Sequence, residues 1–343
     1  MSTNASANEI PPAAVMLELL SSFTITEALI VVAELGVADE LEKGPRSVAQ
    51  IADSIGADPA TLGRVLRCLE SQGIFTTNRE GMYEQTPLSE TLRSNVPGTM
   101  RPFAIMYGQK WYRRPFEGLT ESIRSGGVPF ENTFGMPLFD YLSQDDQTAG
   151  SSIFNDAMTS ISQANEPAVI DAYDFQPFKR IIDVGGGHGA MLSAILESAL
   201  ESNGVLYDLP GVVSGAREAL SGVSDRCEIV AGSFFDGVPG EGDLYVLKLI
   251  IHDWSDERAS VILNNIRTEI PPDGTLLLID GIIPEGDRDK FRKLMDLHMM
   301  AVVGGVERTE VEYRQLLAEA NFELTRVIPS ETGRASLLEA KPV

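Results

Sequence analysis

A glycine-rich segment near the middle of the chain constrains the fold most. Residues 183–189 read Asp-Val-Gly-Gly-Gly-His-Gly; an apolar run that begins at Arg180 enters the segment, and a helix-compatible run over 190–200 leaves it. Glycine lets the backbone turn tightly and approach a ligand, to which the N–H groups of the following helix then point. The segment therefore predicts a strand, a ligand-binding turn and a helix. Nucleotide folds, flavin folds and plain tight turns all use such a loop, so it does not by itself identify the ligand.

An acidic residue further along narrows the choice of ligand. A second short apolar segment, 204–208, places Asp208 at the end of the next predicted strand, about twenty residues beyond the glycines. A carboxylate there can accept hydrogen bonds from both hydroxyls of a ribose. This spacing fits dinucleotide folds and methyltransferase folds equally well, so it indicates an adenosine-containing cofactor. The simpler interpretation is that Asp208 only begins the turn at Pro210.

A third segment carries a candidate base. Residues 243–255 read as a buried strand followed by His252 and Asp253 at its carboxyl end, which is where open α/β sheets place their ligands. Together the three segments resemble the small-molecule O-methyltransferases of the caffeate and acetylserotonin type, and the resemblance extends over nearly the whole chain. It implies S-adenosylmethionine as cofactor and S-adenosylhomocysteine as its product. No metal is expected, because no cluster of His, Asp and Glu in the sequence has the ligand spacing of a zinc or octahedral site.

The pattern of apolar residues divides the chain into three regions. Residues 1–100 give a long helical stretch, two shorter helices and a hairpin that turns at 78–81, which is a winged-helix-like pattern. Residues 101–178 form an aromatic-rich helical linker, which by resemblance contributes to the substrate pocket. Residues 179–343 alternate strands and helices, as a parallel sheet covered on both faces requires. The predicted strands lie near 180–184, 204–208, 227–231, 243–249, 274–280, 322–328 and 335–341. The predicted fold class is α/β, a Rossmann-like seven-stranded methyltransferase sheet with an N-terminal, mostly helical winged-helix dimerisation domain.

Composition limits the partners. The 343 residues carry a formal net charge of −23, which argues against nucleic acid and anionic membranes because phosphate binding needs a basic surface. Winged helices often bind DNA, so a ligand-sensing regulator is a second hypothesis, and the acidic balance disfavours it. By resemblance, the N-terminal domain instead builds a homodimer and covers the partner's substrate pocket. Cys68 and Cys227 are too few for a disulfide framework, and no secretory signal or membrane span is apparent in the first residues, so a cytoplasmic location is expected.

Methyl transfer to oxygen needs a general base. Transfer from a sulfonium is an in-line displacement by a nucleophile that loses its proton in a site without water. The chain has three histidines, and His252 stands where the base should be; histidine has the pKa best placed to accept a proton near neutral pH. By resemblance, Asp280 and Glu307 orient it. Asp280 replaces the glutamate usual in plant relatives, so its shorter side chain is expected to act over a changed backbone distance or through a water. A satisfied core histidine and two solvated or capping carboxylates are the alternatives.

The resemblance also assigns the cofactor pocket. Lys248 interrupts an apolar strand and is expected to hold the main-chain end of the cofactor, unless its ammonium group only reaches solvent at the sheet edge. Ser233 stands where related enzymes commonly have an aspartate that binds the adenine amino group, so adenine recognition is expected to depend on packing against Phe234. His188 is a second departure from the family and receives no function. The predicted cofactor-binding residues are Gly185, Gly187, Asp208, Ser233, Phe234 and Lys248.

Four residues on two predicted helices are assigned to the acceptor pocket. Phe154 and Met158, at i, i+4 spacing, match pocket positions of the resembling family. Met299 is expected to clamp a flat acceptor, with His298 as a polar handle; core packing is the alternative for such methionine and aromatic residues. The sequence thus predicts an enzyme that methylates a hydroxyl of a small aromatic or polyketide-like metabolite. A relative that binds the cofactor without transferring its methyl, or an enzyme with a nitrogen or carbon acceptor, would share these features.

Overall fold

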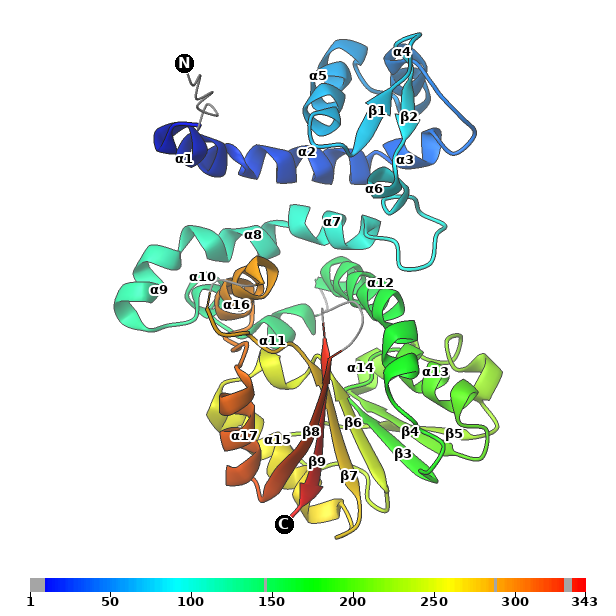
Figure 1. Ribbon diagram of the computed structural model, residues 1–343, viewed down its shortest axis with the longest axis vertical. Helices are drawn as coiled ribbons and strands as arrows, with labels where there is room; N and C mark the ends of the chain where they lie inside the picture. Colours follow the sequence, from blue (N-terminus) through cyan, green and yellow to red (C-terminus); the bar gives the residue numbers. More distant parts are fainter. Residues whose placement is uncertain (1–9, 145–146, 287–288, 330–334) are drawn as a thin grey trace, which may run out of the picture. The chain divides into compact units, whose positions relative to one another are not determined.

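The chain divides into two compact units. The structure is a computed structural model that describes residues 10–144, 147–286, 289–329 and 335–343. The first unit is Met1–Gly108 and the second is Gln109–Val343 (Figure 1). Each unit has its own hydrophobic core, so each is described separately.

The first unit is mostly helical, with a short two-stranded hairpin between its fifth and sixth helices. Residues that cap helices define its elements: the Ser47 side chain forms a capping box with Gln50, and Asp58 accepts the N–H of Thr61 at the start of the following helix. The core packs Ile51, Leu66 and Phe75 together. The elements are α1 (Pro12–Ser21), α2 (Phe23–Glu34), α3 (Val37–Glu40), α4 (Val48–Ile55), α5 (Pro59–Glu70), β1 (Phe75–Thr77), β2 (Tyr83–Gln85), α6 (Pro87–Glu90) and α7 (Arg101–Gly108). This arrangement confirms the predicted winged-helix-like pattern.

One stretch of this unit bears on the expectation that the chain has no membrane span. Residues Pro12–Glu34 are long and apolar enough to cross a membrane by length and composition alone, with a mean hydropathy of 1.8 in the most apolar window, of which 17% is buried. Core helices of water-soluble proteins pass the same test. The second half of the stretch does pack inward, since Val32 and Ala33 belong to the core, whereas α1 exposes Met16, Leu17 and Leu20.

The second unit begins with a run of helices and continues into an α/β sheet. The helices are α8 (Lys110–Glu117), α9 (Leu119–Ser125), α10 (Pro129–Phe134), α11 (Leu138–Leu142) and α12 (Thr148–Ala172). The sheet strands are β3 (Arg180–Val184), β4 (Asn203–Asp208), β5 (Cys227–Ala231), β6 (Leu244–Lys248), β7 (Thr275–Asp280), β8 (Phe322–Pro329) and β9 (Ser336–Pro342). Each strand lies within one residue of the predicted bounds at either end.

The strand order is β5-β4-β3-β6-β7-β9-β8, parallel from β5 to β7, with β9 antiparallel to both of its neighbours. Side chains alternate between two cores: Ile182 and Val184 pack with α15 (Asp256–Glu269) and α17 (Glu310–Glu319), whereas Ile181 packs with α12 and α13 (Ala190–Ser198). Figure 1 shows these helices on opposite faces of the sheet. The remaining elements are α14 (Pro210–Val213), η2 (Ser221–Val223), η3 (Ile251–Asp253) and α16 (Lys290–Val302). The predicted seven-stranded α/β sheet is confirmed.

The topology brings the predicted functional segments to one edge of the sheet. The carboxyl ends of parallel strands share an edge, and ligands bind there where the strand order reverses. Here β3 lies between β4 and β6, so the order reverses at β3. The glycine loop after β3, Asp208 at the end of β4, Lys248 at the end of β6 and Asp280 at the end of β7 therefore lie along the same edge.

Candidate active site

His252 lies in η3, directly after β6, with two carboxylates on one side of its ring and a third on the other. Its Nδ1 is 2.9 Å from Oε1 of Glu307 and 3.5 Å from Oδ1 of Asp280. Its Nε2 is 3.5 Å from Oδ1 of Asp253. The side chain is 10% exposed. The structure thus brings together all three residues predicted to be catalytic, and it adds Asp253, which the sequence analysis left without a function.

Asp280 acts on both the ring and the backbone of His252. It is fully buried at the end of β7, and Oδ2 accepts the His252 backbone N–H at 3.3 Å. Oδ1 accepts the N–H of Gly281 at 3.1 Å. The shorter side chain therefore reaches the imidazole directly at 3.5 Å, and its hydrogen bond to the backbone fixes the start of the loop that carries the ring.

Glu307 lies in the segment between α16 and α17, which passes against the backbone of His252. Gly305 in this segment has no room for a side chain, because an added Cβ would overlap the His252 carbonyl oxygen and lie 2.8 Å from the Cα of Asp253. The N–H of Val306 donates to the same carbonyl at 2.8 Å. Glu307 itself is 2% exposed, and Oδ1 of Asp296 accepts its N–H at 3.1 Å. This close approach brings the carboxylate of Glu307 to the ring.

A buried arginine holds the loop around His252 from behind. Arg308 is 1% exposed and donates to the carbonyl oxygens of Ile251 (3.0 Å), Trp254 (2.8 Å) and Val306 (3.1 Å). Its guanidinium also pairs with Asp256 at 2.8 Å. The planar guanidinium group holds its N–H donors in a fixed arrangement, which lets Arg308 bind these three carbonyl oxygens at once. Arg308 directly follows Glu307 in the sequence, but no motif there indicates its function.

The three carboxylates change the protonation of the ring. Burial alone would lower the pKa of His252, but the charges of Asp280, Asp253 and Glu307 outweigh it and raise this pKa to about 10. Burial raises the pKa of Asp253 to about 7 against the opposing effect of His252. The hydrogen bond from His252 lowers the pKa of Glu307 in spite of its burial. The three charges therefore favour the protonated, imidazolium form of the ring, whereas the sequence led to the expectation of a histidine suited to accept a proton near neutral pH.

The glycine loop has the backbone geometry that its sequence predicts. Gly185, Gly187 and Gly189 have φ values of 73°, 61° and 84°, in the left-handed region that favours glycine. An added Cβ on Gly185 would lie 2.6 Å from Cδ1 of Ile250. The N–H of Gly187 donates to Oδ2 of Asp208 at 2.8 Å, so the carboxylate predicted to bind a ribose lies directly against the loop.

Lys248 lies among groups from β3 and α12. Its ammonium donates to the Ser162 hydroxyl, which in turn donates to Glu166 at 3.1 Å. Burial lowers the pKa of Lys248 to about 8, opposed by the charges of Glu166 and Asp183. Burial raises the pKa of Asp183 to about 7. The Lys248 ammonium therefore lies within a polar cluster of the second unit. Its side chain does not simply extend to solvent at the sheet edge, which was the alternative.

The segment after β5 brings Phe234 to the glycine loop. An added Cβ on Gly185 would lie 3.4 Å from the Phe234 ring, which also meets Trp254 edge to face at a centroid distance of 6.0 Å. Ser233 Oγ accepts the N–H of Phe235 at 3.3 Å. Phe234 thus lies where packing against a ligand in the loop is possible, while the Ser233 hydroxyl has a local hydrogen bond.

The predicted acceptor residues lie on α12 and α16. Phe154 packs edge to face on Phe139 (5.9 Å), and Phe139 in turn lies 5.5 Å from Trp254, which connects α12 to the His252 loop. Met158 and Met299 are partly buried. The Met299 carbonyl accepts the N–H of Gly305 at 3.1 Å, so the end of α16 is tied to the Glu307 segment.

His298 belongs to an aromatic cluster with α8. Its Nδ1 is 3.0 Å from the hydroxyl of Tyr112, on which it stacks, and its ring lies 4.8 Å from that of Phe116. Burial lowers the pKa of His298, so the ring is neutral at pH 7.

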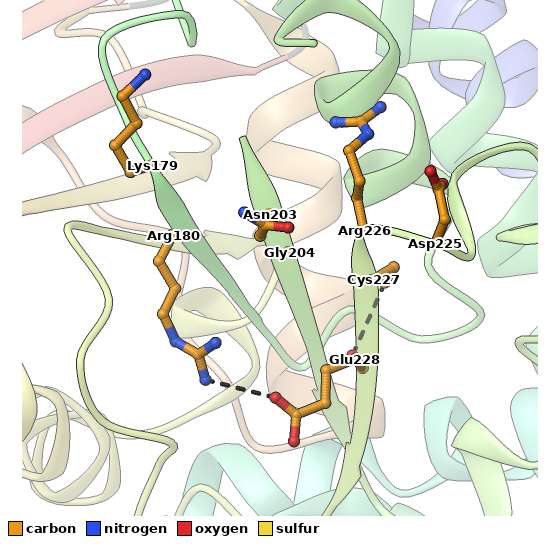
Figure 2. Close-up of a pocket in the computed structure, with 8 residues that line it drawn as sticks. All are labelled: Lys179, Arg180, Asn203, Gly204, Asp225, Arg226, Cys227 and Glu228. Atoms are coloured by element: carbon orange, nitrogen blue, oxygen red, sulfur yellow. Dashed lines mark hydrogen bonds and ion pairs between the residues drawn. The ribbon is translucent and has the colours of Figure 1, made fainter. Parts of the chain in front are cut away.

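The second unit also has a pocket of about 370 Å³ at the amino ends of β3, β4 and β5. Figure 2 shows Arg180 directed toward Glu228 there, at 3.5 Å, beside Cys227. This pocket is at the opposite edge of the sheet from His252, and none of the predicted site residues lines it. Within the described residues, no group of three or more His, Cys, Asp and Glu side chains is arranged to hold a metal ion.

Comparison with protein families agrees with the fold and the site. A family described as the O-methyltransferase domain matches residues 116–323, and the O-methyltransferase dimerisation domain matches residues 17–95. The chain belongs to the O-methyltransferase family. The resemblance inferred from the three sequence segments and the predicted enzyme class are thereby confirmed.

Individual relatives of this O-methyltransferase cover its full length. Phenazine O-methyltransferase PhzM of Lysobacter antibioticus is 40% identical over 345 residues, which cover 100% of both chains. The crystal structure of LaPhzM has a TM-score of 0.90 at 40% identity and covers 97% of this chain and 100% of that one. The O-methyltransferase NcsB1 from neocarzinostatin biosynthesis, solved with S-adenosylmethionine and 2-hydroxy-5-methyl naphthoic acid, has a TM-score of 0.80 at 30% identity, covering 98% and 100%.

Proposed function

We propose that this O-methyltransferase transfers the methyl group of S-adenosylmethionine to a hydroxyl of a small aromatic or polyketide-like metabolite, with His252 as general base. The observation that carries the proposal is the buried imidazole at the carboxyl edge of the sheet, bonded to Glu307 at 2.9 Å and close to Asp280. A relative of similar fold, NcsB1, has been solved with this cofactor and a hydroxylated aromatic acid. Asp280 and Glu307 are the residues that orient the base.

The residues near the glycine loop fit an adenosine-containing cofactor. The left-handed glycines allow close approach, Asp208 lies against the loop to accept ribose hydroxyls, and Phe234 offers a ring for the adenine. Gly185, Gly187, Ser233 and Lys248 complete the proposed set, with Lys248 near the main-chain end. When bound, S-adenosylmethionine supplies an electrophilic methyl group on a sulfonium. No metal is part of the proposal.

The protein's own residues handle the acceptor proton. In its neutral form His252 presents Nε2, which lies beside Asp253, as the acceptor of the hydroxyl proton, because its Nδ1 faces Glu307 and Asp280. With S-adenosylmethionine bound, the deprotonated acceptor oxygen would take the methyl group, and the cofactor would leave as S-adenosylhomocysteine. The imidazolium then returns its proton to solvent. Phe154, Met158, His298 and Met299 are proposed to hold the acceptor in line with the methyl group, where exclusion of water and fixed orientation lower the barrier.

The assembly proposed for this enzyme is a homodimer. The match to the O-methyltransferase dimerisation domain supports it, as does the apolar surface of α1 and the start of α2, where Met16, Leu17, Leu20 and Phe23 are exposed. We propose this surface as a contact with a second copy rather than with a membrane or a nucleic acid, and a cytoplasmic location accords with two free cysteines. Light scattering on the purified chain gives the mass, and a monomer at micromolar concentration would contradict the proposal.

Methyl transfer can be tested directly. The enzyme is incubated with S-adenosylmethionine that carries a labelled methyl group and with a panel of phenols, catechols, quinones and polyketides, beside a His252→Ala control. Transfer of label to oxygen that depends on His252 supports the proposal. Label on nitrogen or carbon would change the acceptor class. Tight cofactor binding without transfer to any acceptor would favour a relative that does not transfer methyl groups.

A further inference from the structure

A buried arginine contacts the carboxylate that orients His252. Arg292 lies near the start of α16 and is 4% exposed, although an arginine side chain is rarely buried unless it is paired. Its Nη1 is 3.4 Å from Oε2 of Glu307. The other oxygen of the same carboxylate, Oε1, is 2.9 Å from Nδ1 of His252. Glu307 therefore connects the guanidinium to the imidazole, one oxygen to each.

The surrounding backbone makes room for this pair. An added Cβ on Gly281 would overlap the Arg292 guanidinium and lie 2.5 Å from Oε2 of Glu307, so only glycine after Asp280 leaves space for the contact. The N–H of Arg292 donates to the side chain of Asp289, which caps the first turn of α16 at 3.1 Å. The arginine thus has a fixed position at the start of a helix whose far end is tied to the Glu307 segment through Met299.

The positive charge of Arg292 affects the protonation of His252. The imidazole faces three carboxylates, and Arg292 is ion-paired to one of them, whereas Arg308, which is also buried, pairs with Asp256. A cation beside a cluster with excess negative charge stabilises its ionised carboxylates and disfavours a further proton on the histidine. The titratable and charged groups that face the ring or its partners are Asp253, Asp280, Arg292, Asp296, Glu307, Arg308 and Tyr313.

We propose that Arg292 is a positioning residue for catalysis, which fixes the carboxylate of Glu307 against His252 and offsets the negative charge that would otherwise keep the base protonated. The inference rests on the proposed function of His252 as general base. Arg292 itself touches neither substrate nor cofactor in this scheme. It acts through Glu307, and its charge, rather than its size, is what the base requires.

The sign of the expected effect follows from electrostatics. Removal of a cation makes protonation of every nearby group easier, so the pKa of His252 rises and its neutral, proton-accepting form becomes scarcer at a given pH. An opposite charge within a few ångströms moves a pKa by about 1–3 units, and a charge that acts through an intervening residue is expected to move it by about one unit. The acid limb of the kcat/KM profile of Arg292→Met should therefore move about one pH unit toward alkaline pH.

The three histidines of the chain allow a direct measurement. The full-length enzyme is labelled with 13C at histidine Cε1, and the His252 signal is assigned by its loss in His252→Ala. Its pKa is then read by NMR titration in the wild type, Arg292→Met and Arg292→Lys. We expect a rise of about one unit in Arg292→Met and a value within about 0.3 unit of wild type in Arg292→Lys, which keeps the charge. Arg314→Met is the matched control, because Arg314 is half-exposed and pairs with Glu310 at 2.7 Å on the surface.

The outcomes separate this inference from the proposed function. A His252 pKa that does not change in a folded, cofactor-binding Arg292→Met overturns the positioning function of Arg292 and leaves His252 untouched. Unchanged methyl transfer by His252→Ala overturns the proposed base, whatever Arg292 does to the titration. If Arg292→Met fails to fold, Arg292→Gln keeps a donor for Glu307 without the charge, and it must show the same rise; a wild-type pKa in that variant also overturns the proposal.

Discussion

Replacement of Glu307 by glutamine tests how the carboxylates set the strength of the proposed base, His252. The amide keeps the size and an oxygen that can accept from Nδ1 of His252, now 2.9 Å from the carboxylate, but it removes the charge. A charge at this distance is worth about two pKa units, or roughly 3 kcal/mol at 1.36 kcal/mol per unit. The pKa of His252, raised by three carboxylates to about 10, should therefore fall to about 8 in Glu307→Gln.

This shift has opposite effects at the two ends of the pH range. At pH 7 the neutral fraction of the base rises from about 1 in 1,000 to about 1 in 10, because each pKa unit is a factor of ten. A weaker base removes the acceptor proton more slowly, by on the order of tenfold for a two-unit change. Glu307→Gln should thus be more active than wild type near pH 6–7 and about tenfold less active near pH 10, so the two profiles cross.

The assay is kcat/KM for label transfer over pH 6–10.5 with one phenol as acceptor, whose own ionisation near pH 10 cancels in the ratio of variant to wild type at each pH. Glu310→Gln, three residues further along, is the control: its carboxylate pairs with Arg314 on the surface, and its profile should coincide with that of wild type. A Glu307→Gln profile that is lower at every pH, with its acid limb unmoved, would show that Glu307 supports the loop but does not tune the base. That result would refute the idea that the charge of Glu307 sets the strength of the base.

Three further predictions concern the loop, the sheet edge and the acceptor. Gly305→Ala forces the His252 backbone to move, so it should lower the free energy of unfolding in urea by about 1–3 kcal/mol and kcat/KM on the order of a hundredfold. Gly222→Ala is the control: its Cβ would lie 3.6 Å from a Glu197 oxygen, and neither quantity should change. Asp183→Asn should stabilise the cofactor-free protein. In the folded wild type the pKa of Asp183 is raised from 3.8 to about 7, so the free energy of unfolding falls by roughly 4 kcal/mol as the pH rises from about 4 to 7. The variant has no carboxyl group at this position and should not show this loss. Equal gains in urea midpoint at pH 5 and pH 8 would contradict that assignment. Met299→Ala should raise the acceptor KM by on the order of tenfold with an unchanged cofactor Kd in calorimetry, and an unchanged KM would remove Met299 from the pocket.

The fold could be predicted closely because its signals are local. Apolar runs that end at glycine or aspartate define β3, β4, β5 and β7, as at 180–184 before the glycine loop, and the period of a helix defines elements between them. The position of His252 followed from the same logic, since a residue after a parallel strand must lie at the carboxyl edge of the sheet. Each of these predictions depends only on residues that are close together in the sequence.

The electrostatics of the site could not be predicted in this way. Arg308 donates to a carbonyl 57 residues earlier in the chain, and Arg292 meets a carboxylate 15 residues later, across a helix and a loop. No spacing rule connects these pairs, because tertiary packing brings them together. The expected pKa of His252 near neutrality also differs from the structure, because Asp280 and Glu307, 28 and 55 residues further along, join Asp253 around the ring and their charges together raise its pKa.

If the proposed base is His252, its high pKa also limits the acceptor hydroxyls from which it can take a proton. A proton moves between groups of equal pKa at little cost, and a phenol, with a pKa near 10, matches a ring raised to about 10. An alcohol with a pKa near that of water, about 15.7, would be almost six units too weak an acid, a penalty of roughly 8 kcal/mol. With His252 as the proposed base, we expect the carboxylate cluster to favour aromatic hydroxyls by its charge alone, before the shape of the pocket is considered. Label transfer to a phenol should exceed transfer to its benzylic alcohol analogue by orders of magnitude in kcat, and comparable rates would mean that the acceptor proton does not pass to His252.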